Sequence, residues 1–302
     1  MMISQTQIQP SRARAWLLAS RPATLPAAVV PVLVGAALAA AGGRFAVGPF
    51  LAALCASLLI QIGTNFANDL FDFQKGADTA ARLGPQRVTQ SGLIPPSAVK
   101  QAMILTFTAA ALIGVYLIAV GGLPILIIGV LSIISAIAYT GGPWPLGYHG
   151  LGEVFVFLFF GVVAVTGTYY LQTGAVTWTA LLVSVPVGLL CTAIIVVNNV
   201  RDIDTDRAAG KRTLAVRIGR TATRGLYAAC VAISYLIPVA LWLAGTLTPL
   251  ALLPLVTLPL AVPLVRLVAT ETAGPPLNRA LKGTGRLHLL FGLLFAVGLL
   301  RF

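Results

Sequence analysis

Nine long apolar stretches alternate with polar segments along the chain. Each stretch is about 20 residues long, which is the length that a helix needs to cross the hydrocarbon core of a bilayer. The pattern predicts an all-α polytopic membrane protein, with residues 1–302 forming a single transmembrane domain. The nine predicted transmembrane helices cover about 22–41, 48–67, 98–119, 121–140, 152–172, 177–199, 223–244, 247–269 and 286–301.

The composition supports a membrane protein and excludes a soluble one. Charged residues make up 9% of the chain, whereas soluble domains carry roughly 25%. The net charge of +12 would suggest a nucleic-acid partner in a soluble protein. Here the basic residues stand between apolar stretches, so we expect them to set the membrane topology and to face anionic lipid or an anionic substrate, with no nucleic acid bound.

The distribution of basic residues predicts the orientation. If the N-terminus is inside, 18 of the 20 lysines and arginines fall in inside segments, and only Arg44 and Arg301 fall outside. The positive-inside rule therefore places the N-terminus in the cytoplasm and the C-terminus outside. The long polar segments 68–97 and 200–222 both fall on the inside, so we expect the chemistry at the cytoplasmic face.

All six aspartates lie in two segments, 65–78 and 198–206. These segments leave the cytoplasmic ends of the second and sixth predicted helices. An aspartate at bilayer depth costs roughly 2.5–3.5 kcal/mol on insertion scales, and less near the interface. Acids that merely decorated a surface would scatter along the chain, so this concentration predicts one shared site.

The spacing of these acids favours a metal site. Asn198, Asp202 and Asp206 repeat every four residues, which puts them on one face of a helix. Carboxylate and amide oxygens suit Mg²⁺, which usually completes its shell with waters and substrate phosphates. The predicted metal ligands are Asn68, Asp69, Asp72, Asp78, Asn198, Asp202 and Asp206. The basic side chains predicted to hold a diphosphate are Lys75, Arg82, Lys211 and Arg212.

Two other interpretations of the acids stay open. The acids could simply balance neighbouring arginines in topology-setting loops. They could also belong to a transporter for a cation or a small anion, although transporter acids should lie in mid-span rather than at span ends.

The motifs NDLFD (68–72) and NNVRDIDTD (198–206) resemble the two Asp-rich motifs of the UbiA superfamily of intramembrane prenyltransferases. The resemblance implies a Mg²⁺-dependent enzyme that transfers a prenyl group from a polyprenyl diphosphate to an aromatic acceptor. One position departs from the family pattern, since the last aspartate of the usual first motif is replaced by Gly76. The next acid in this chain is Asp78.

Four further segments, 16–35, 75–94, 139–153 and 202–219, resemble the superfamily branch that acts on 1,4-dihydroxy-2-naphthoate in menaquinone biosynthesis. That resemblance implies release of CO₂ and diphosphate, a demethylmenaquinol product and a place in the bacterial inner (cytoplasmic) membrane. A family member that uses 4-hydroxybenzoate or homogentisate remains an alternative. The prenyl chain length and the oligomeric state stay open.

The remaining candidate residues follow from the chemistry that such a transfer needs. Asp72 and Asp202 are expected to act in catalysis through the metal, Tyr139 would stabilise an allylic cation through its ring, and His149 could remove a proton from a ring hydroxyl. The predicted acceptor-binding residues are Arg21, Arg87, Tyr148 and Glu153. For Arg21 a snorkelling anchor is an equally good interpretation.

Overall fold

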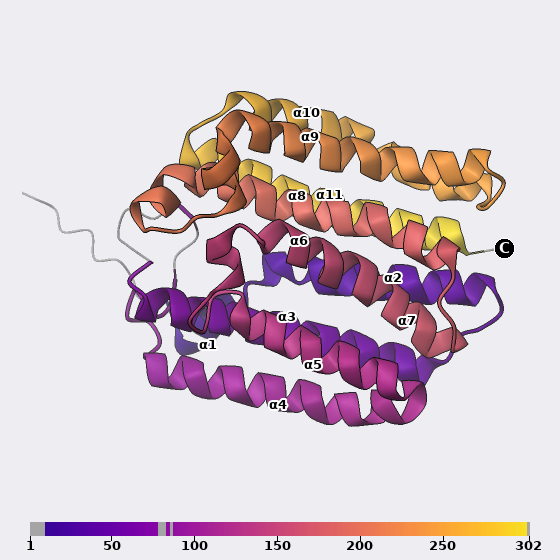
Figure 1. Ribbon diagram of the computed structural model, residues 1–302, viewed down its shortest axis with the longest axis horizontal. Coiled ribbons are helices and arrows are strands. Elements are labelled where there is room, and N and C mark those ends of the chain that lie inside the picture. The colour runs from indigo at the N-terminus through magenta and orange to yellow at the C-terminus, as the bar shows by residue number, and fades with distance from the viewer. Residues whose placement is uncertain (1–9, 78–82, 85–86, 301–302) are drawn as a thin grey trace, which may run out of the picture.

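The computed structural model describes residues 10–77, 83–84 and 87–300, and every regular element in these ranges is helical. The helices run roughly alongside one another as an elongated bundle (Figure 1). Their bounds are α1 Arg12–Ser20, α2 Pro26–Ala41, α3 Val47–Gln74, α4 Pro96–Gly121, α5 Leu123–Ala138, α6 Gly152–Val156, α7 Ala164–Thr173, α8 Trp178–Ala208, α9 Leu214–Leu243, α10 Leu258–Thr270 and α11 Gly274–Leu299. The tighter or wider helical turns are η1 Pro22–Thr24, η2 Leu146–His149, the π-helix η3 Phe157–Val163 and η4 Pro249–Thr257.

Within the described residues, seven helices are long and apolar enough to cross a membrane. An eighth span results if the segments Arg12–Thr24 and Pro26–Ala41, which meet at a bend of 48°, are counted as one. The ninth apolar stretch of the sequence forms α5, a shorter apolar helix of 16 residues. A multi-span helical membrane protein is therefore confirmed, whereas the number nine stays a prediction.

The helix that contains the last predicted span begins before that span. We expected a short helix at 286–301, but α11 begins at Gly274 and has 26 residues. Arg279, Lys282 and Arg286 misled the prediction because they interrupt the apolar run, although the helix continues through them.

The core surrounds α8, which packs against α9, α11, α2 and the π-helix η3. Small residues allow this close packing, as is usual between helices in membranes. A Cβ atom on Gly161 of η3 would lie 2.5 Å from Gly188 Cα of α8, so the two backbones touch there. The inner face of α8 is a stripe of fully buried aliphatic residues: Val183, Val187, Leu190, Val196, Val197 and Val200.

The two aspartate motifs lie on helices rather than in loops. Helix α3 extends to Gln74 and α8 to Ala208, each several residues beyond the predicted apolar stretch. Both end in the same way: the carbonyl of Asp72 accepts from the Ala77 amide, the carbonyl of Asp206 accepts from the Lys211 amide, and a glycine with positive φ intervenes. This is the Schellman arrangement of a helix C-terminus.

Gly76, which stands where the resemblance to the UbiA superfamily implies an aspartate, has a structural role. Gly76 has φ +65° and Gly210 has φ +73°, and each stands four residues after the last aspartate on its helix. Glycine tolerates this left-handed conformation, which costs other residues about 1–2 kcal/mol. Position 76 therefore terminates α3 and presents Asp72 on its last turn.

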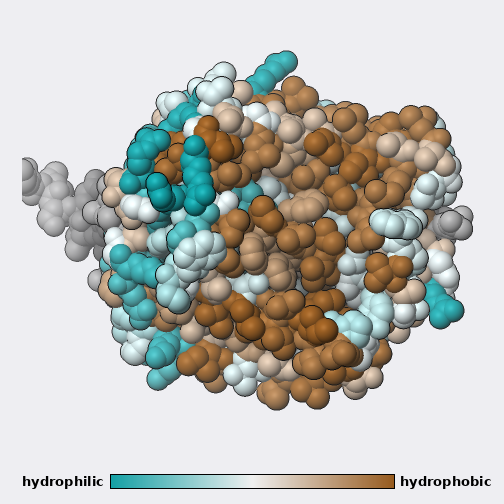
Figure 2. Space-filling view, viewed as in Figure 1, coloured by the Kyte–Doolittle hydropathy of each residue, from teal (hydrophilic) through white to brown (hydrophobic). Residues whose placement is uncertain are grey.

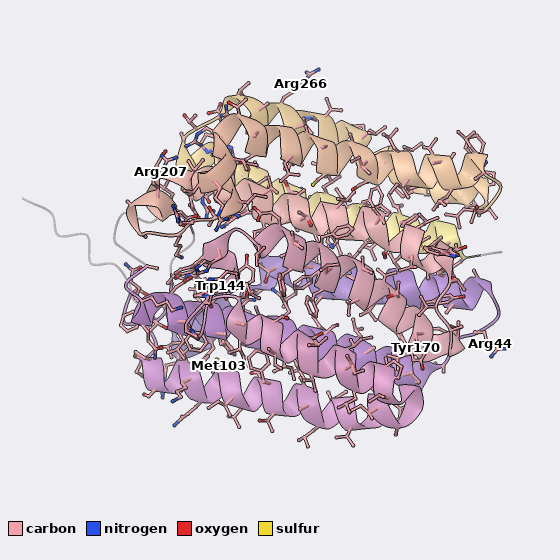
Figure 3. The ribbon with its side chains drawn as sticks, viewed as in Figure 1. Arg44, Met103, Trp144, Tyr170, Arg207 and Arg266 are labelled. Carbon is pink, nitrogen blue, oxygen red and sulfur yellow. The ribbon has the colours of Figure 1, made fainter. Side chains whose placement is uncertain are left out.

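Polar groups gather at one end of the bundle, while apolar side chains cover most of its length in this view (Figure 2). The polar end is the one that carries Arg207 and Trp144, and Arg44 lies at the opposite end (Figure 3). The motifs of α3 and α8 therefore occupy the end of the bundle that holds most of the charged side chains.

Candidate active site

Asp72 connects three segments that are distant in the sequence. Its carboxylate is buried and pairs with Arg87 at 2.9 Å and with Lys211 Nζ at 3.1 Å. It also accepts a 2.6 Å hydrogen bond from the Tyr148 hydroxyl. The segments predicted to form the site, 75–94, 139–153 and 202–219, thus converge on one carboxylate.

Two lysines flank the ring of Tyr148. Lys211 Nζ lies 4.6 Å and Lys75 Nζ 5.1 Å from the ring centroid. Lys75 also donates to the carbonyls of Thr140 at 2.8 Å and Gly142 at 3.1 Å. The pKa of Lys75 is lowered, mainly because burial disfavours its charged form. The negative charge of Asp72 raises this pKa, and the positive charge of Lys211 lowers it. The sequence grouped both lysines with the diphosphate, and the structure places both beside Tyr148.

The second motif is organised by an arginine that the sequence prediction left out. Arg201 is fully buried and donates two hydrogen bonds to the carboxylate of Asp202. It also donates to Asn198 Oδ1 at 2.8 Å and to Asn278 Oδ1 of α11 at 2.8 Å. The sequence could have identified Arg201, because an arginine three residues after Asn198 faces the same side of the helix.

The third aspartate of this motif, Asp204, faces outward. It pairs with Arg207 at 3.4 Å and with Arg220 at 2.9 Å, and its side chain is 74% exposed. Arg220 also donates to the carbonyl of Val200, so it ties the start of α9 to the end of α8. This exposure separates Asp204 from the site, as the four-residue spacing of Asp202 and Asp206 predicts.

Asp69 holds a distant backbone segment against α3. Its carboxylate is buried and accepts from the backbone amides of Val88 at 3.2 Å and Thr89 at 3.1 Å. Both oxygens therefore hold the 87–94 segment, which delivers Arg87 to Asp72. Asp69 therefore has a structural role, and the metal role expected of it stays a prediction.

Asn68 and Tyr139 link the first motif to the 139–151 segment. Asn68 Oδ1 accepts from the Thr140 hydroxyl at 2.9 Å. The carbonyl of Tyr139 accepts from the Gly147 amide at 2.9 Å, so Tyr139 anchors the segment that follows it.

The other acceptor and catalytic candidates are spread around this centre. Glu153 accepts a 2.8 Å hydrogen bond from Asn199 Nδ2. The ring of His149 stacks on that of Trp144 at 4.2 Å, and its Nδ1 lies 2.9 Å from the carbonyl of Pro145, so its visible contacts stay within its own loop.

Arg21 lies beside the helix that carries the first motif. Its guanidinium donates to the carbonyl of Asn65 at 3.4 Å. Its φ of +49° is the only positive value for a non-glycine residue in the part of the chain that the structure describes. Such a conformation costs of order 1–3 kcal/mol and is found often at functional sites.

Arg212 joins two loops over the site. Its backbone amide donates to the carbonyl of Tyr148 at 2.9 Å. Together with Val216 and Arg217, its side chain lines an open cavity of about 440 Å³. Two further predicted residues, Asp78 and Arg82, lie outside the described residues.

The donor set fits Mg²⁺ bound with a phosphate ligand. No group of three or more His, Cys, Asp or Glu side chains suitable for a metal occurs among the described residues. Mg²⁺ in proteins usually takes only one or two carboxylates plus substrate phosphates and water. Asn68 with Asp72, and Asn198 with Asp202, are oxygen pairs of that kind.

Comparison with known proteins agrees with this geometry. Residues 28–299 match the model of the UbiA prenyltransferase family. The chain is 41% identical to a 1,4-dihydroxy-2-naphthoate octaprenyltransferase of Escherichia coli (strain K12), over 97% of both chains. It is 39% identical to a protein of the same name from Mycobacterium tuberculosis, over 93% of this chain and 95% of the relative.

The fold has solved counterparts. A UbiA homolog from Aeropyrum pernix K1 superposes with a TM-score of 0.70 at 15% identity, over 90% of this chain and 97% of the other. A homolog from Archaeoglobus fulgidus, solved with GPP and Mg²⁺ bound, superposes with a TM-score of 0.66 at 15% identity, over 94% and 99% of the two chains.

Proposed function

Because the chain belongs to the UbiA prenyltransferase family, we propose that it transfers a polyprenyl group from polyprenyl diphosphate to 1,4-dihydroxy-2-naphthoate. The reaction releases CO₂ and diphosphate and gives demethylmenaquinol. The observation that carries the proposal is the convergence on Asp72 of Arg87, Tyr148 and Lys211, which come from the segments that distinguish this branch in the sequence.

The diphosphate would bind between the two motifs with Mg²⁺. Asn68, Asp72, Asn198, Asp202 and Asp206 would hold the metal, with Asp78 as a further candidate. When bound, Mg²⁺ supplies positive charge that stabilises the leaving diphosphate. The side chains that would contact the diphosphate are Lys75, Lys211, Arg212 and Arg82.

The contacts of two basic side chains with Asp72 support this proposal. Lys211 and Arg87 contact Asp72 in the structure, so a bound diphosphate would find donors within reach of the carboxylate that holds the metal. Fixed donors that face a developing charge in a site shielded from water stabilise it more than solvent does.

The ring of Tyr139 would face the allylic cation. An aromatic face stabilises a nearby cation by about 0.5–2 kcal/mol without attacking it. Tyr139 lies against the start of α6, the helix that carries Glu153, so its ring would stand between the diphosphate and the acceptor. The naphthoate would then lie among Arg21, Arg87, Tyr148 and Glu153, with His149 available to a ring hydroxyl.

The long prenyl tail requires lipid, which suits a multi-span protein of the bacterial cytoplasmic membrane. We propose nine transmembrane helices, with the N-terminus and the active site facing the cytoplasm and the C-terminus outside. The 18-to-2 division of basic residues supports this orientation.

The test uses purified protein in lipid nanodiscs, supplied with a polyprenyl diphosphate and 1,4-dihydroxy-2-naphthoate. Prenylated quinol and CO₂ are measured by mass spectrometry with Mg²⁺ or with EDTA. We expect product only with Mg²⁺, and its loss in Asp72→Ala and Asp202→Ala, while Asp204→Ala serves as the control because Asp204 faces solvent. Product with 4-hydroxybenzoate or homogentisate alone would overturn the acceptor, and no product with any acceptor would favour the transporter.

A further inference from the structure

One oxygen of a buried carboxylate near the site has no hydrogen-bond partner. Glu153 is 4% exposed, and its Oε1 accepts from Asn199 Nδ2 at 2.8 Å. Its Oε2 accepts no hydrogen bond from any described residue, and Glu153 takes part in none of the ion pairs seen among them. Buried polar atoms in proteins nearly always have a partner, so this oxygen is open to a donor from a ligand or a water molecule.

The position of Glu153 places that ligand beside the diphosphate site. A Cβ atom on Gly152 would lie 2.8 Å from the Tyr139 hydroxyl, so the Tyr139 side chain covers the start of α6. Asn199, which donates to Glu153, directly follows the motif residue Asn198 on α8. Glu153 is therefore held beside Tyr139 and next to the second aspartate motif.

The other acceptor-binding candidates have different contacts. Arg87 and Tyr148 bind Asp72, and Arg21 donates to a backbone carbonyl of α3. These three residues offer cationic or hydroxyl donors, and such donors suit the carboxylate of an aromatic acid. A carboxylate such as Glu153 would repel that group but accepts readily from a hydroxyl.

We propose that Glu153, held in place by Asn199, accepts a hydrogen bond from a ring hydroxyl of the aromatic acceptor. This inference rests on the proposed function and adds to it the group that recognises the hydroxyl. The contact selects hydroxyaromatic acceptors and fixes which ring carbon faces the prenyl donor. The hydrogen bond to a carboxylate also raises the electron density at the carbon next to that hydroxyl, while the proton stays on the hydroxyl oxygen.

The experiment compares 1,4-dihydroxy-2-naphthoate with its two monomethyl ethers, in which one hydroxyl can no longer donate. Steady-state kinetics are measured for the wild type and for Glu153→Gln, which keeps the shape but removes the charge. The second glutamate of the chain provides the matched control, Glu271→Gln. A further variant, Asn199→Leu, removes the donor that orients Glu153 while Glu153 itself is unchanged.

The wild type should prefer the free hydroxyl over one of the two ethers. In Glu153→Gln we expect kcat/KM for 1,4-dihydroxy-2-naphthoate to fall about 10–100-fold, the range of one hydrogen bond to a charged group. The preference for the free hydroxyl over that ether should fall by a similar factor, and the KM for the prenyl diphosphate should stay within about twofold. Asn199→Leu should shift the same preference in the same direction, and Glu271→Gln should leave it unchanged.

An unchanged ether preference in Glu153→Gln, or an equal loss towards both substrates, would refute the recognition role and leave only a structural one. The proposed function fails in a different way. If the wild type prenylates 4-hydroxybenzoate instead, the acceptor assignment is wrong. The role of Glu153 is then tested by comparing 4-hydroxybenzoate with its methyl ether. If the wild type prenylates no hydroxyaromatic compound, both proposals fall.

Discussion

Arg201 allows the organisation of the second motif to be tested directly. Its side chain is fully buried and satisfies both oxygens of Asp202 as well as the side-chain oxygens of Asn198 and Asn278. Arg201→Ala would leave the 8%-exposed Asp202 without this cation. Removing one partner of a buried ion pair costs about 3–5 kcal/mol, because the remaining charge stays buried and unpaired.

Arg207 is the matched control on the same helix. It pairs with Asp204 at 3.4 Å, but the two side chains are 60% and 74% exposed. Exposed pairs of this kind contribute about 0–1 kcal/mol. We therefore expect Arg207→Ala to leave the unfolding temperature nearly unchanged, and Arg201→Ala to lower it by roughly 6 °C or more, using about 2–4 °C for each kcal/mol.

The assay is thermal unfolding in nanodiscs, followed by intrinsic fluorescence, together with Mg²⁺ titration of activity. Since Arg201 orients both Asn198 and Asp202, its loss should also raise the Mg²⁺ concentration for half-maximal activity by about 10–100-fold. Equal unfolding temperatures for Arg201→Ala and Arg207→Ala would refute the assignment of Arg201 as the organiser of the motif. An unchanged Mg²⁺ requirement would refute its link to the metal.

Three further changes test the first motif. Asp69→Ala should lower the free energy of unfolding by about 1–3 kcal/mol, because it leaves two buried amides of 87–94 without an acceptor. Proteolysis of the 87–94 segment in the folded protein should become faster, and an unchanged cleavage rate would contradict this role of Asp69. Gly76→Ala should destabilise by about 1–2 kcal/mol through its positive φ alone, since nothing lies within 4 Å of the added Cβ; Gly114→Ala, in a helix with equal space, should not lower the unfolding temperature. Lys75 should lose its proton below its ordinary pKa of 10.5, so the KM for polyprenyl diphosphate should rise at lower pH in the wild type than in Lys75→Arg. The contribution of Lys75 to stability should rise with pH, because the unfolded chain binds that proton more tightly than the folded one. Identical pH profiles of KM for the wild type and Lys75→Arg would contradict this.

The outcome at the site shows which inferences from spacing were sound. The four-residue repeat of Asn198, Asp202 and Asp206 separated Asp204 from its neighbours, and Asp204 is indeed exposed. Spacing did not predict that Asp69, on the motif face of α3, accepts from backbone amides of a distant segment. A helix face can be worked out from spacing, but the groups that approach that face come from elsewhere in the chain.

The limits of the prediction are clearest for Arg201 and Asn199. Both stand within the second motif, and neither was among the predicted site residues. Arg201 serves the site because Asn278 of α11 and Asp202 surround it, and Asn199 serves it because Glu153 of α6 lies opposite. These pairings join residues 46 and 77 positions apart in the chain.

The amino-acid sequence by itself determined that this is a multi-span helical protein with two acidic motifs at helix ends. Those properties depend on local physics: a stretch of about 20 apolar residues partitions into lipid as a helix, and charges are kept near its ends by their cost within the bilayer. The tertiary structure decided which donor each carboxylate meets. Asp72 received three partners, Asp69 two amides and Glu153 a single amide, because burial makes each charge depend on the side chains that packing brings beside it.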